Sequence, residues 1–213
     1  MLNLIAAWLR VALLCAVLVA GGTANGKPAA ILVVGDSLSA EYGLPRDTGW
    51  VRLLSDRLAK EAAQYSVVNA SISGETTSGG RTRLQLLLKQ HQPSVVVLQL
   101  GANDGLRGLS PTAMRENLAT MIRASRGAGA QVLLIGIRIP PNYGREYSER
   151  FAAVYAQLAR DEKVALVPFL LDGFADDLGY FQADRIHPSE RAQPRMLETV
   201  WPQLAPLLRA KRR

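Results

Sequence analysis

Residues 29–39 read A-A-I-L-V-V-G-D-S-L-S, and this stretch decides how the rest of the chain is interpreted. Four apolar residues, Ile31 to Val34, run without alternation and end at Gly35. The pattern is typical of a strand buried on both faces, although a run this short also fits buried helix. Gly35 permits a sharp exit, and Ser37 then follows the carboxyl end of the strand, where open α/β sheets bind their ligands. We therefore expect Ser37 to be a nucleophile that later segments activate.

The composition is that of a globular protein. The chain has 213 residues, of which 48% are hydrophobic and 20% charged, enough for one domain with a real core. No shift in composition divides residues 25–213, so we expect a single domain there. The net charge is +7, and four cations belong to one tail at Arg209 and residues 211–213. Such a tail is either solvated or in contact with anionic lipid, and nucleic-acid binding is disfavoured.

Residues 1–24 predict an export signal that is cleaved. A ten-residue apolar core, Val11 to Ala20, follows Arg10, and the small residues Gly22 and Ala24 suit a signal-peptidase site. The alternative is a membrane anchor, because only Arg10 interrupts the apolar stretch. Cys15 is the only cysteine, so cleavage would leave a domain without disulfides, a cysteine nucleophile or a thiolate metal site. We expect a periplasmic or secreted protein.

Strand-like and helical patterns alternate along the remaining chain. Further strands are predicted over residues 66–69, 95–100, 132–137 and 164–167. Helices are predicted over residues 50–64, around 84–90, and over 110–126, 148–160 and 188–200. Pro194 should disturb the last helix, and Pro202 and Pro206 should break the segment after it. The alternation predicts a three-layer α/β fold with a five-stranded parallel sheet, whose carboxyl ends share one rim.

A serine nucleophile needs a base, and residues 25–213 contain two histidines. His187 lies in D-R-I-H-P, three residues after Asp184. In a helical turn the carboxylate can hold one ring nitrogen, which leaves the other free to take the proton of Ser37. Alternatively, Asp184 and His187 form a surface pair at the start of a helix. His91, at a helix end on the opposite rim, is the weaker choice of base.

The same rim offers donors for an oxyanion. The backbone N–H groups of Ser37 and Gly74 and the side-chain amide of Asn103 form a plausible oxyanion hole. Alternatively, Gly74 is an ordinary loop glycine and Asn103 forms an Asx turn. Asp36 is expected to brace either the turn at Ser37 or a neighbouring loop, and Asp104 is expected to organise its own loop. We find no metal-binding cluster and no phosphate-binding loop.

Four ordered motifs resemble the blocks of the SGNH (GDSL) hydrolases. They are G-D-S-L at residues 35–38, Gly74, G-x-N-D at 101–104 and D-x-x-H at 184–187, and the resemblance covers about residues 29–208. It implies a flavodoxin-like α/β/α fold and an esterase that needs no cofactor. It also implies that Ser37 attacks the acyl carbonyl, His187 is the base and Asp184 orients it, while Ser37, Gly74 and Asn103 bind the oxyanion.

Further segments resemble a bacterial branch of that family, which implies medium-to-long acyl esters, thioesters and lysophospholipids as substrates. Such an acyl pocket needs apolar surface near the rim, or these residues are ordinary core. The residues expected to line it are Leu38, Leu106, Ile137, Ile139, Pro140 and Phe181. Two other functions remain open: a deacetylase of aryl or carbohydrate esters, and a lipid carrier without turnover. We expect a monomer whose partner is a small acyl ester.

Overall fold

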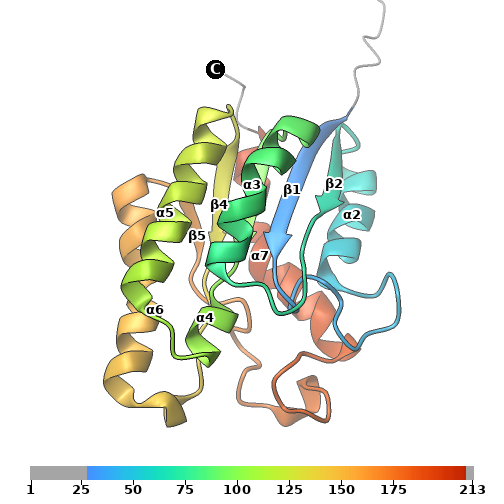
Figure 1. Cartoon of the computed structure of the whole chain (residues 1–213). Coiled ribbons are helices and arrows are strands. Elements are labelled where there is room, and N and C mark those ends of the chain that lie inside the picture. Colours follow the sequence, from blue (N-terminus) through green and yellow to red (C-terminus); the bar gives the residue numbers. More distant parts are fainter. Residues whose placement is uncertain (1–27, 210–213) are drawn as a thin grey trace, which may run out of the picture.

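The structure is a computed structural model that describes residues 28–209, so the predicted export signal and residues 211–213 lie outside the described part. Five strands form one parallel sheet in the order β2-β1-β3-β4-β5 (Figure 1). The strands are β1 (Ala29–Gly35), β2 (Tyr65–Asn69), β3 (Val95–Gln99), β4 (Gln131–Ile135) and β5 (Ala165–Val167). The predicted α/β class and the parallel sheet are confirmed.

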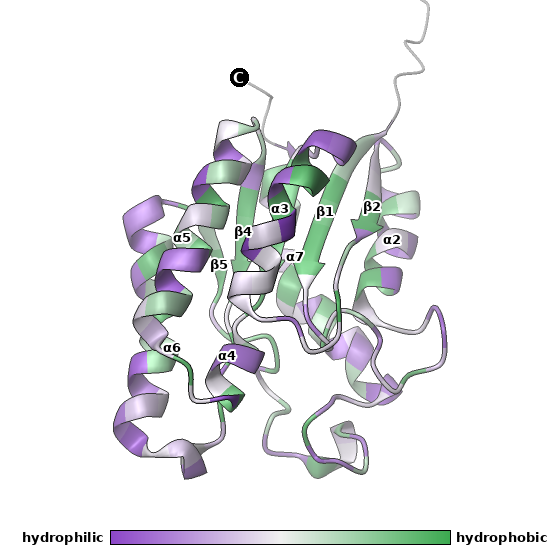
Figure 2. Ribbon diagram, viewed as in Figure 1, coloured by the Kyte–Doolittle hydropathy of each residue, from purple (hydrophilic) through white to green (hydrophobic). Residues whose placement is uncertain are grey.

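The opening apolar run is the centre of this sheet. Ile31 pairs with Val67 of β2 on one side and with Val95 of β3 on the other. All four residues from Ile31 to Val34 are fully buried, because helices cover both faces of the strand. Figure 2 shows the strands as the most hydrophobic part of the molecule, with helices that are hydrophilic on their outer sides.

The helices form two layers around the sheet. α3 (Thr77–His91), α5 (Pro111–Gly127) and α6 (Arg145–Glu162) cover the front face in Figure 1, while α2 (Trp50–Glu61) and α7 (Gln193–Arg209) cover the back. The chain leaves β1 for β2 on one side, and β3 lies on the other side of β1. The switch point between β1 and β3 is therefore where this fold class binds ligands. Within residues 28–209, no helix has the length and apolarity to span a bilayer.

The structure contains helical segments beyond those predicted. α3 begins at Thr77, well before the helix predicted around residues 84–90, because the Thr76 side chain caps its first turn by accepting from the N–H of Gly79. α4 (Ala102–Leu106) occupies the G-x-N-D region. Three short 3₁₀ helices complete the fold: η1 (Pro141–Tyr143), η2 (Leu178–Tyr180) and η3 (Glu190–Ala192).

The prediction for the last helix is wrong at both ends. Pro188 pairs with Phe181 in an isolated antiparallel bridge, and α7 begins only at Gln193. The helix then continues to Arg209 with Pro202 and Pro206 inside it. Both prolines are exposed, so water can reach the carbonyl groups that they leave without donors. Packing of the opposite face holds the helix in place; its buried residues include Met196, Val200, Leu204 and Leu208.

A buried polar network joins the carboxyl ends of β1 and β3. The Gln99 side chain donates to Asp36 Oδ1 (3.1 Å) and accepts from the hydroxyl of Ser39 (2.6 Å). Asp36 Oδ1 also accepts from the N–H of Leu38 at 3.0 Å, which confirms that Asp36 braces the turn at Ser37. Burial is the largest influence on this carboxyl and raises its pKa from 3.8 to about 6, although the hydrogen bonds from Leu38 and Gln99 oppose the rise.

Asp36 should make the folded state lose stability as the pH rises. The carboxyl binds its proton more tightly in the folded protein than in the unfolded chain. Below pH 4 the ionisation of Asp36 therefore leaves the free energy of unfolding unchanged. Above pH 6 it lowers the free energy of unfolding by about 3 kcal/mol. Asp36→Asn should remove this slope from the free energy of unfolding measured by urea titration between pH 4 and 7. Parallel pH curves for the two proteins would contradict the assignment.

Pro202→Ala should stabilise the protein by about 1–3 kcal/mol, because the new N–H can donate to the carbonyl of Glu198 in the preceding turn. Pro194→Ala is the matched control. Pro194 is the second residue of α7, where a backbone N–H has no partner within the helix, so this change should have little effect. Thermal and urea unfolding of both variants measures the difference. A destabilised Pro202→Ala would show that the proline is needed for packing.

Candidate active site

Ser37 lies on a tight turn directly after β1. The backbone carbonyl of Asp36 accepts from the N–H groups of Ser39 and Ala40 at 3.1 and 3.0 Å. Together with the Asp36 carboxylate, these contacts fix the turn from both sides of the serine. Within residues 28–209, the N–H of Ser37 itself donates to no acceptor. The turn therefore presents a half-buried hydroxyl beside a free backbone donor.

His187 and Asp184 come from a hairpin rather than from the predicted helical turn. Phe181 pairs with Pro188, and the N–H of Gln182 donates to the carbonyl of His187 at 2.8 Å. Arg185 takes a positive φ of 58° at the tip, where the chain reverses between Asp184 and His187. The hairpin spans residues 180–189 and places both side chains at the carboxyl rim of the sheet.

The structure brings Ser37, His187 and Asp184 into one line of hydrogen bonds. His187 Nε2 lies 3.0 Å from Ser37 Oγ, and His187 Nδ1 lies 2.7 Å from Asp184 Oδ2. Asp184 Oδ1 accepts from the N–H groups of Ile186 and His187. Desolvation would raise the pKa of Asp184, but these hydrogen bonds and the nearby imidazole outweigh it and lower the pKa to about 2. The carboxylate is thus ionised at neutral pH and can orient the ring.

Tyr42 packs on the imidazole and was not found by sequence reasoning. Its ring lies 4.4 Å from the His187 ring, centroid to centroid, at an interplanar angle of 40°. The Gln182 side chain donates to the carbonyl of Tyr42 at 2.8 Å, which joins the hairpin to the loop after β1. No motif marks this tyrosine, because the contact depends on how two distant loops meet.

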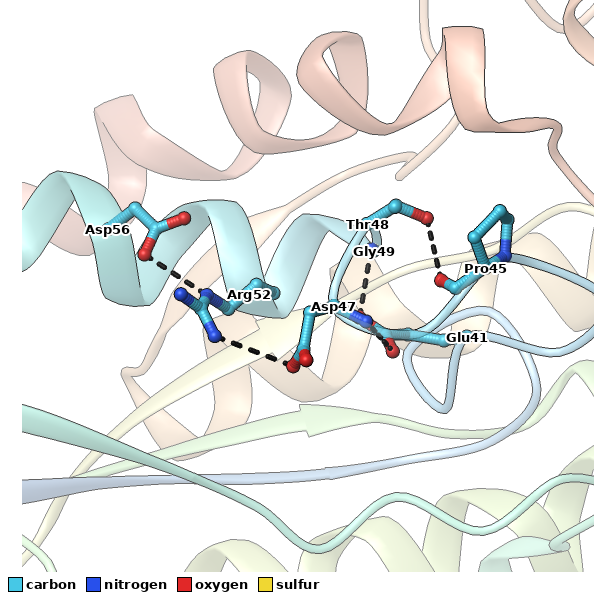
Figure 3. Close-up of polar contacts among 7 residues, drawn as sticks. All are labelled: Glu41, Pro45, Asp47, Thr48, Gly49, Arg52 and Asp56. Atoms are coloured by element: carbon cyan, nitrogen blue, oxygen red, sulfur yellow. Dashed lines mark hydrogen bonds and ion pairs between the residues drawn. The ribbon is translucent and has the colours of Figure 1, made fainter.

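A ring of polar contacts shapes the loop that carries Tyr42 (Figure 3). The Glu41 carboxylate accepts from the backbone N–H groups of Asp47 and Gly49 at 3.0 and 2.8 Å. Arg52 of α2 then bonds to Asp47 and to Asp56. The loop is therefore anchored to α2, and Tyr42 has a defined position over His187.

Gly74 and Asn103 lie on neighbouring loops of the same rim. Gly74 has a φ of +80°, a conformation that favours glycine, and it is exposed. Within residues 28–209 its N–H has no acceptor. Asn103 lies in α4, and its amide nitrogen donates to the carbonyl of Glu75 at 3.0 Å. One hydrogen of that amide is thus used to hold the Gly74 loop, and the other is available to a ligand.

Arg107 and Asp104, from the same part of the chain, hold the Gly74 loop and the start of α3. Arg107 Nη2 donates to the carbonyl of Gly74 at 2.9 Å. The Asp104 carboxylate accepts from the N–H and the hydroxyl of Thr77 at 2.8 and 2.6 Å, so its partner is the start of α3 and not its own loop as expected. Arg107 was missed because the stretch was interpreted as loop. A helix there would have placed Arg107 on the same face as Asn103, four residues earlier.

The residues expected to line an acyl pocket differ in burial. Leu38, Ile137 and Ile139 are 5–9% exposed and belong to the core, while Leu106 and Phe181 are half-buried and Pro140 is exposed. The side chain of Ile139 packs against Gly105 of α4. These residues surround the rim, but their contact with an acyl chain stays a prediction.

His91, the other histidine considered as a base, lies far from Ser37 in the fold. His91 is the last residue of α3 and precedes β3, so it lies at the amino ends of the strands, opposite Ser37. In the part of the chain that the structure describes, no group of three His, Cys, Asp or Glu side chains could hold a metal ion. His187 is therefore the histidine that the fold brings to the serine.

Comparison with known proteins agrees with this geometry. The profile of the GDSL-like Lipase/Acylhydrolase family matches residues 33–193. The chain is 56% identical over 178 residues to Esterase TesA of Pseudomonas aeruginosa, covering 84% of this chain and 89% of the relative. It is 44% identical over 178 residues to thioesterase 1/protease 1/lysophospholipase L1 of Escherichia coli K12, covering 84% of each chain.

A solved structure supports the same relationship. The crystal structure of TesA superimposes with a TM-score of 0.81 at 55% identity and covers 84% of this chain and 99% of the solved chain. The family match spans most of the sequence, and the four motifs and strands β2 to β5 fall within it. The chain therefore belongs to the GDSL-like lipase/acylhydrolase family, the SGNH hydrolases, and is an ester or thioester hydrolase.

Proposed function

We propose that the protein cleaves medium-to-long acyl esters and thioesters through an acyl-enzyme on Ser37. The observation that carries the proposal is the continuous hydrogen-bonded line from Ser37 Oγ through His187 to the Asp184 carboxylate. A serine hydroxyl is a weak nucleophile at neutral pH, and a positioned imidazole that accepts its proton makes it reactive.

In the first step, Ser37 Oγ attacks the acyl carbonyl carbon as its proton moves to His187 Nε2. Asp184 accepts the Nδ1–H of the resulting imidazolium and stabilises its positive charge. When the tetrahedral intermediate collapses, the carbon–oxygen or carbon–sulfur bond to the leaving group breaks. Nε2 gives its proton to the departing alcohol or thiol, and the acyl group remains on Ser37.

In the second step, water replaces the leaving group. His187 takes a proton from the water, whose oxygen attacks the acyl-enzyme carbonyl. Collapse of this second intermediate returns the proton to Ser37 Oγ and releases the carboxylic acid. The reaction consumes one water and needs no redox partner.

Negative charge develops on the substrate carbonyl oxygen in both steps. The free N–H groups of Ser37 and Gly74 and the second amide hydrogen of Asn103 are the donors that we assign to it. Loss of one such donor typically lowers kcat by about 10²–10³-fold. Arg107 and Asn103 support this assignment, because they donate to the carbonyl groups of Gly74 and Glu75 and so hold the Gly74 loop against α4.

Two sets of observations support the substrate class. The relatives carry the names esterase and thioesterase/lysophospholipase. Two of the apolar residues expected at the pocket, Leu106 and Ile139, also follow the carboxyl ends of β3 and β4, at the same rim as Ser37, and Ile139 packs against Gly105 of α4. We further propose that the enzyme acts after export, on the strength of the apolar segment at residues 11–20 and the small residues after it.

A panel of acyl esters tests the proposal. The protein should hydrolyse p-nitrophenyl octanoate and decanoate and an acyl-CoA, with a higher kcat/KM on long chains than on acetate. Ser37→Ala should lower kcat by about 10⁴-fold or more without unfolding the protein. A strict preference for acetyl esters would contradict the proposed chain length and favour a deacetylase. Full activity of Ser37→Ala would overturn the mechanism.

Ile139→Thr should separate long from short substrates. The change exchanges a buried apolar branch for a hydroxyl near the rim, so kcat/KM on decanoyl esters should fall about tenfold while acetyl esters change little. Ile122→Thr is the matched control, because Ile122 is fully buried in α5 and is not among the residues expected at the pocket. An equal loss on both substrates would remove Ile139 from the pocket.

A further inference from the structure

The exposed apolar side chains of this protein are not scattered. Among the described residues, seven large apolar side chains are exposed, and six of them lie on the loops and short 3₁₀ helices at the carboxyl rim. Leu86, in the outer part of α3, is the exception and is 67% exposed. The six rim residues are Tyr42, Ile72, Leu109, Tyr143, Leu178 and Ile186. Single exposed apolar residues are ordinary, but their concentration around one site is not.

These six residues, which we call the apolar rim, follow the carboxyl ends of the strands, at the same edge of the sheet as Ser37 and His187. Ile186 directly precedes His187, and the ring of Tyr42 packs on the imidazole. The N–H of Ile72 donates to the carbonyl of Gly35, immediately before the nucleophile turn. The rim loops lie together at the lower edge of the sheet in Figure 1. A surface that contacts the apolar rim would therefore face the site directly.

The loops of the apolar rim are held in place rather than free to bury their apolar groups. The Tyr147 hydroxyl donates to the carbonyl of Leu109 at 2.8 Å, and the Tyr143 hydroxyl donates to that of Leu106 at 3.1 Å. The N–H of Phe181 donates to the carbonyl of Leu178 at the end of η2. Each apolar side chain is thus presented to solvent from a fixed backbone, at a lasting cost in solvation.

The charges around the apolar rim nearly cancel. The exposed cations on the loops after the strands are Arg46, Arg107, Arg138 and Arg185. The exposed anions there are Asp47, Asp172, Asp176, Asp177 and Asp184. A strongly anionic surface would be drawn by an excess of arginine and lysine, which the rim lacks. The partner that fits the apolar rim is a lipid surface whose head groups carry no net charge and cover an apolar interior.

We propose that the apolar rim docks on a zwitterionic phospholipid surface, from which an acyl chain passes to Ser37. The inference rests on the proposed function, because it supplies the route by which a poorly soluble ester reaches the site. Docking on such a surface depends on the apolar area buried, so it should be nearly independent of salt.

The experiment compares two variants of the full chain, as expressed and processed by the producing cell. Leu109→Ser/Leu178→Ser removes one apolar side chain from each side of the rim, and neither residue is part of the proposed catalytic machinery. Leu86→Ser is the matched control, because it removes an even more exposed leucine outside the rim. Co-flotation with phosphatidylcholine vesicles measures the affinity, at 0.1 and 1 M salt.

The double variant should bind the vesicles about tenfold or more weakly than the wild type, and Leu86→Ser should bind like the wild type. Hydrolysis of lysophosphatidylcholine in micelles should fall with vesicle binding in the double variant. Hydrolysis of the water-soluble p-nitrophenyl acetate should be unchanged. Equal flotation of all three proteins would overturn the inference.

Other outcomes would also overturn it. Binding that needs anionic lipid and disappears in 1 M salt would assign the contact to the basic C-terminal tail. A dimer that the double variant dissociates would assign the rim to a second copy of the chain. These failures are distinct from failure of the proposed function, which would appear as a wild-type protein without activity on the soluble esters.

Discussion

The hydrogen bond between Ser37 Oγ and His187 Nε2 joins residues 150 positions apart in the chain, and the arrangement of the site depends on it. Neither residue can make this contact from its own segment alone. The hairpin of residues 180–189 and the loop after β1 are joined by the Gln182 side chain and by the ring contact of Tyr42. Glu41 and Arg52 in turn fix that loop on α2. Ser37 and His187 are therefore positioned by one continuous set of contacts, which begins at α2.

The proposed oxyanion donors depend on a different set of contacts. Gly74 follows β2 and Asn103 follows β3, on either side of the serine that follows β1. α4 joins them, because its residues reach the Gly74 loop and the start of α3. Two sets of contacts therefore meet at Ser37, one that holds the groups of the proposed proton transfer and one that holds the proposed oxyanion donors. Because they share few contacts, a substitution in one set can leave the other intact.

The sequence predicted those features that depend on hydrophobic pattern and motif spacing. Among these features are the buried run that begins at Ile31 and the five-stranded parallel sheet. The location of Ser37, Gly74 and Asn103 at one rim of the sheet is another. Prediction failed where tertiary contacts decide the local structure. Buried leucines keep α7 helical through Pro202 and Pro206. The D-x-x-H residues lie on a hairpin and not in a helical turn. Tyr42 left no signal of its own, and the spacing of Arg107 from Asn103 would have been a signal only if a helix had been predicted there. Gln99 did leave one, because a glutamine in an apolar strand needs buried partners.

The turn at Ser37 shows why a poorly solvated carboxylate is retained beside the nucleophile. In the proposed mechanism the N–H of Ser37 must remain free to bind the oxyanion, so it cannot serve to hold the turn. The neighbouring groups hold the turn instead, because Asp36 accepts from Leu38 through its side chain, and from Ser39 and Ala40 through its carbonyl. A neutral side chain that only packs would give Leu38 no acceptor. The carboxylate that gives Leu38 its acceptor is buried at this place, and that burial raises the pKa of Asp36.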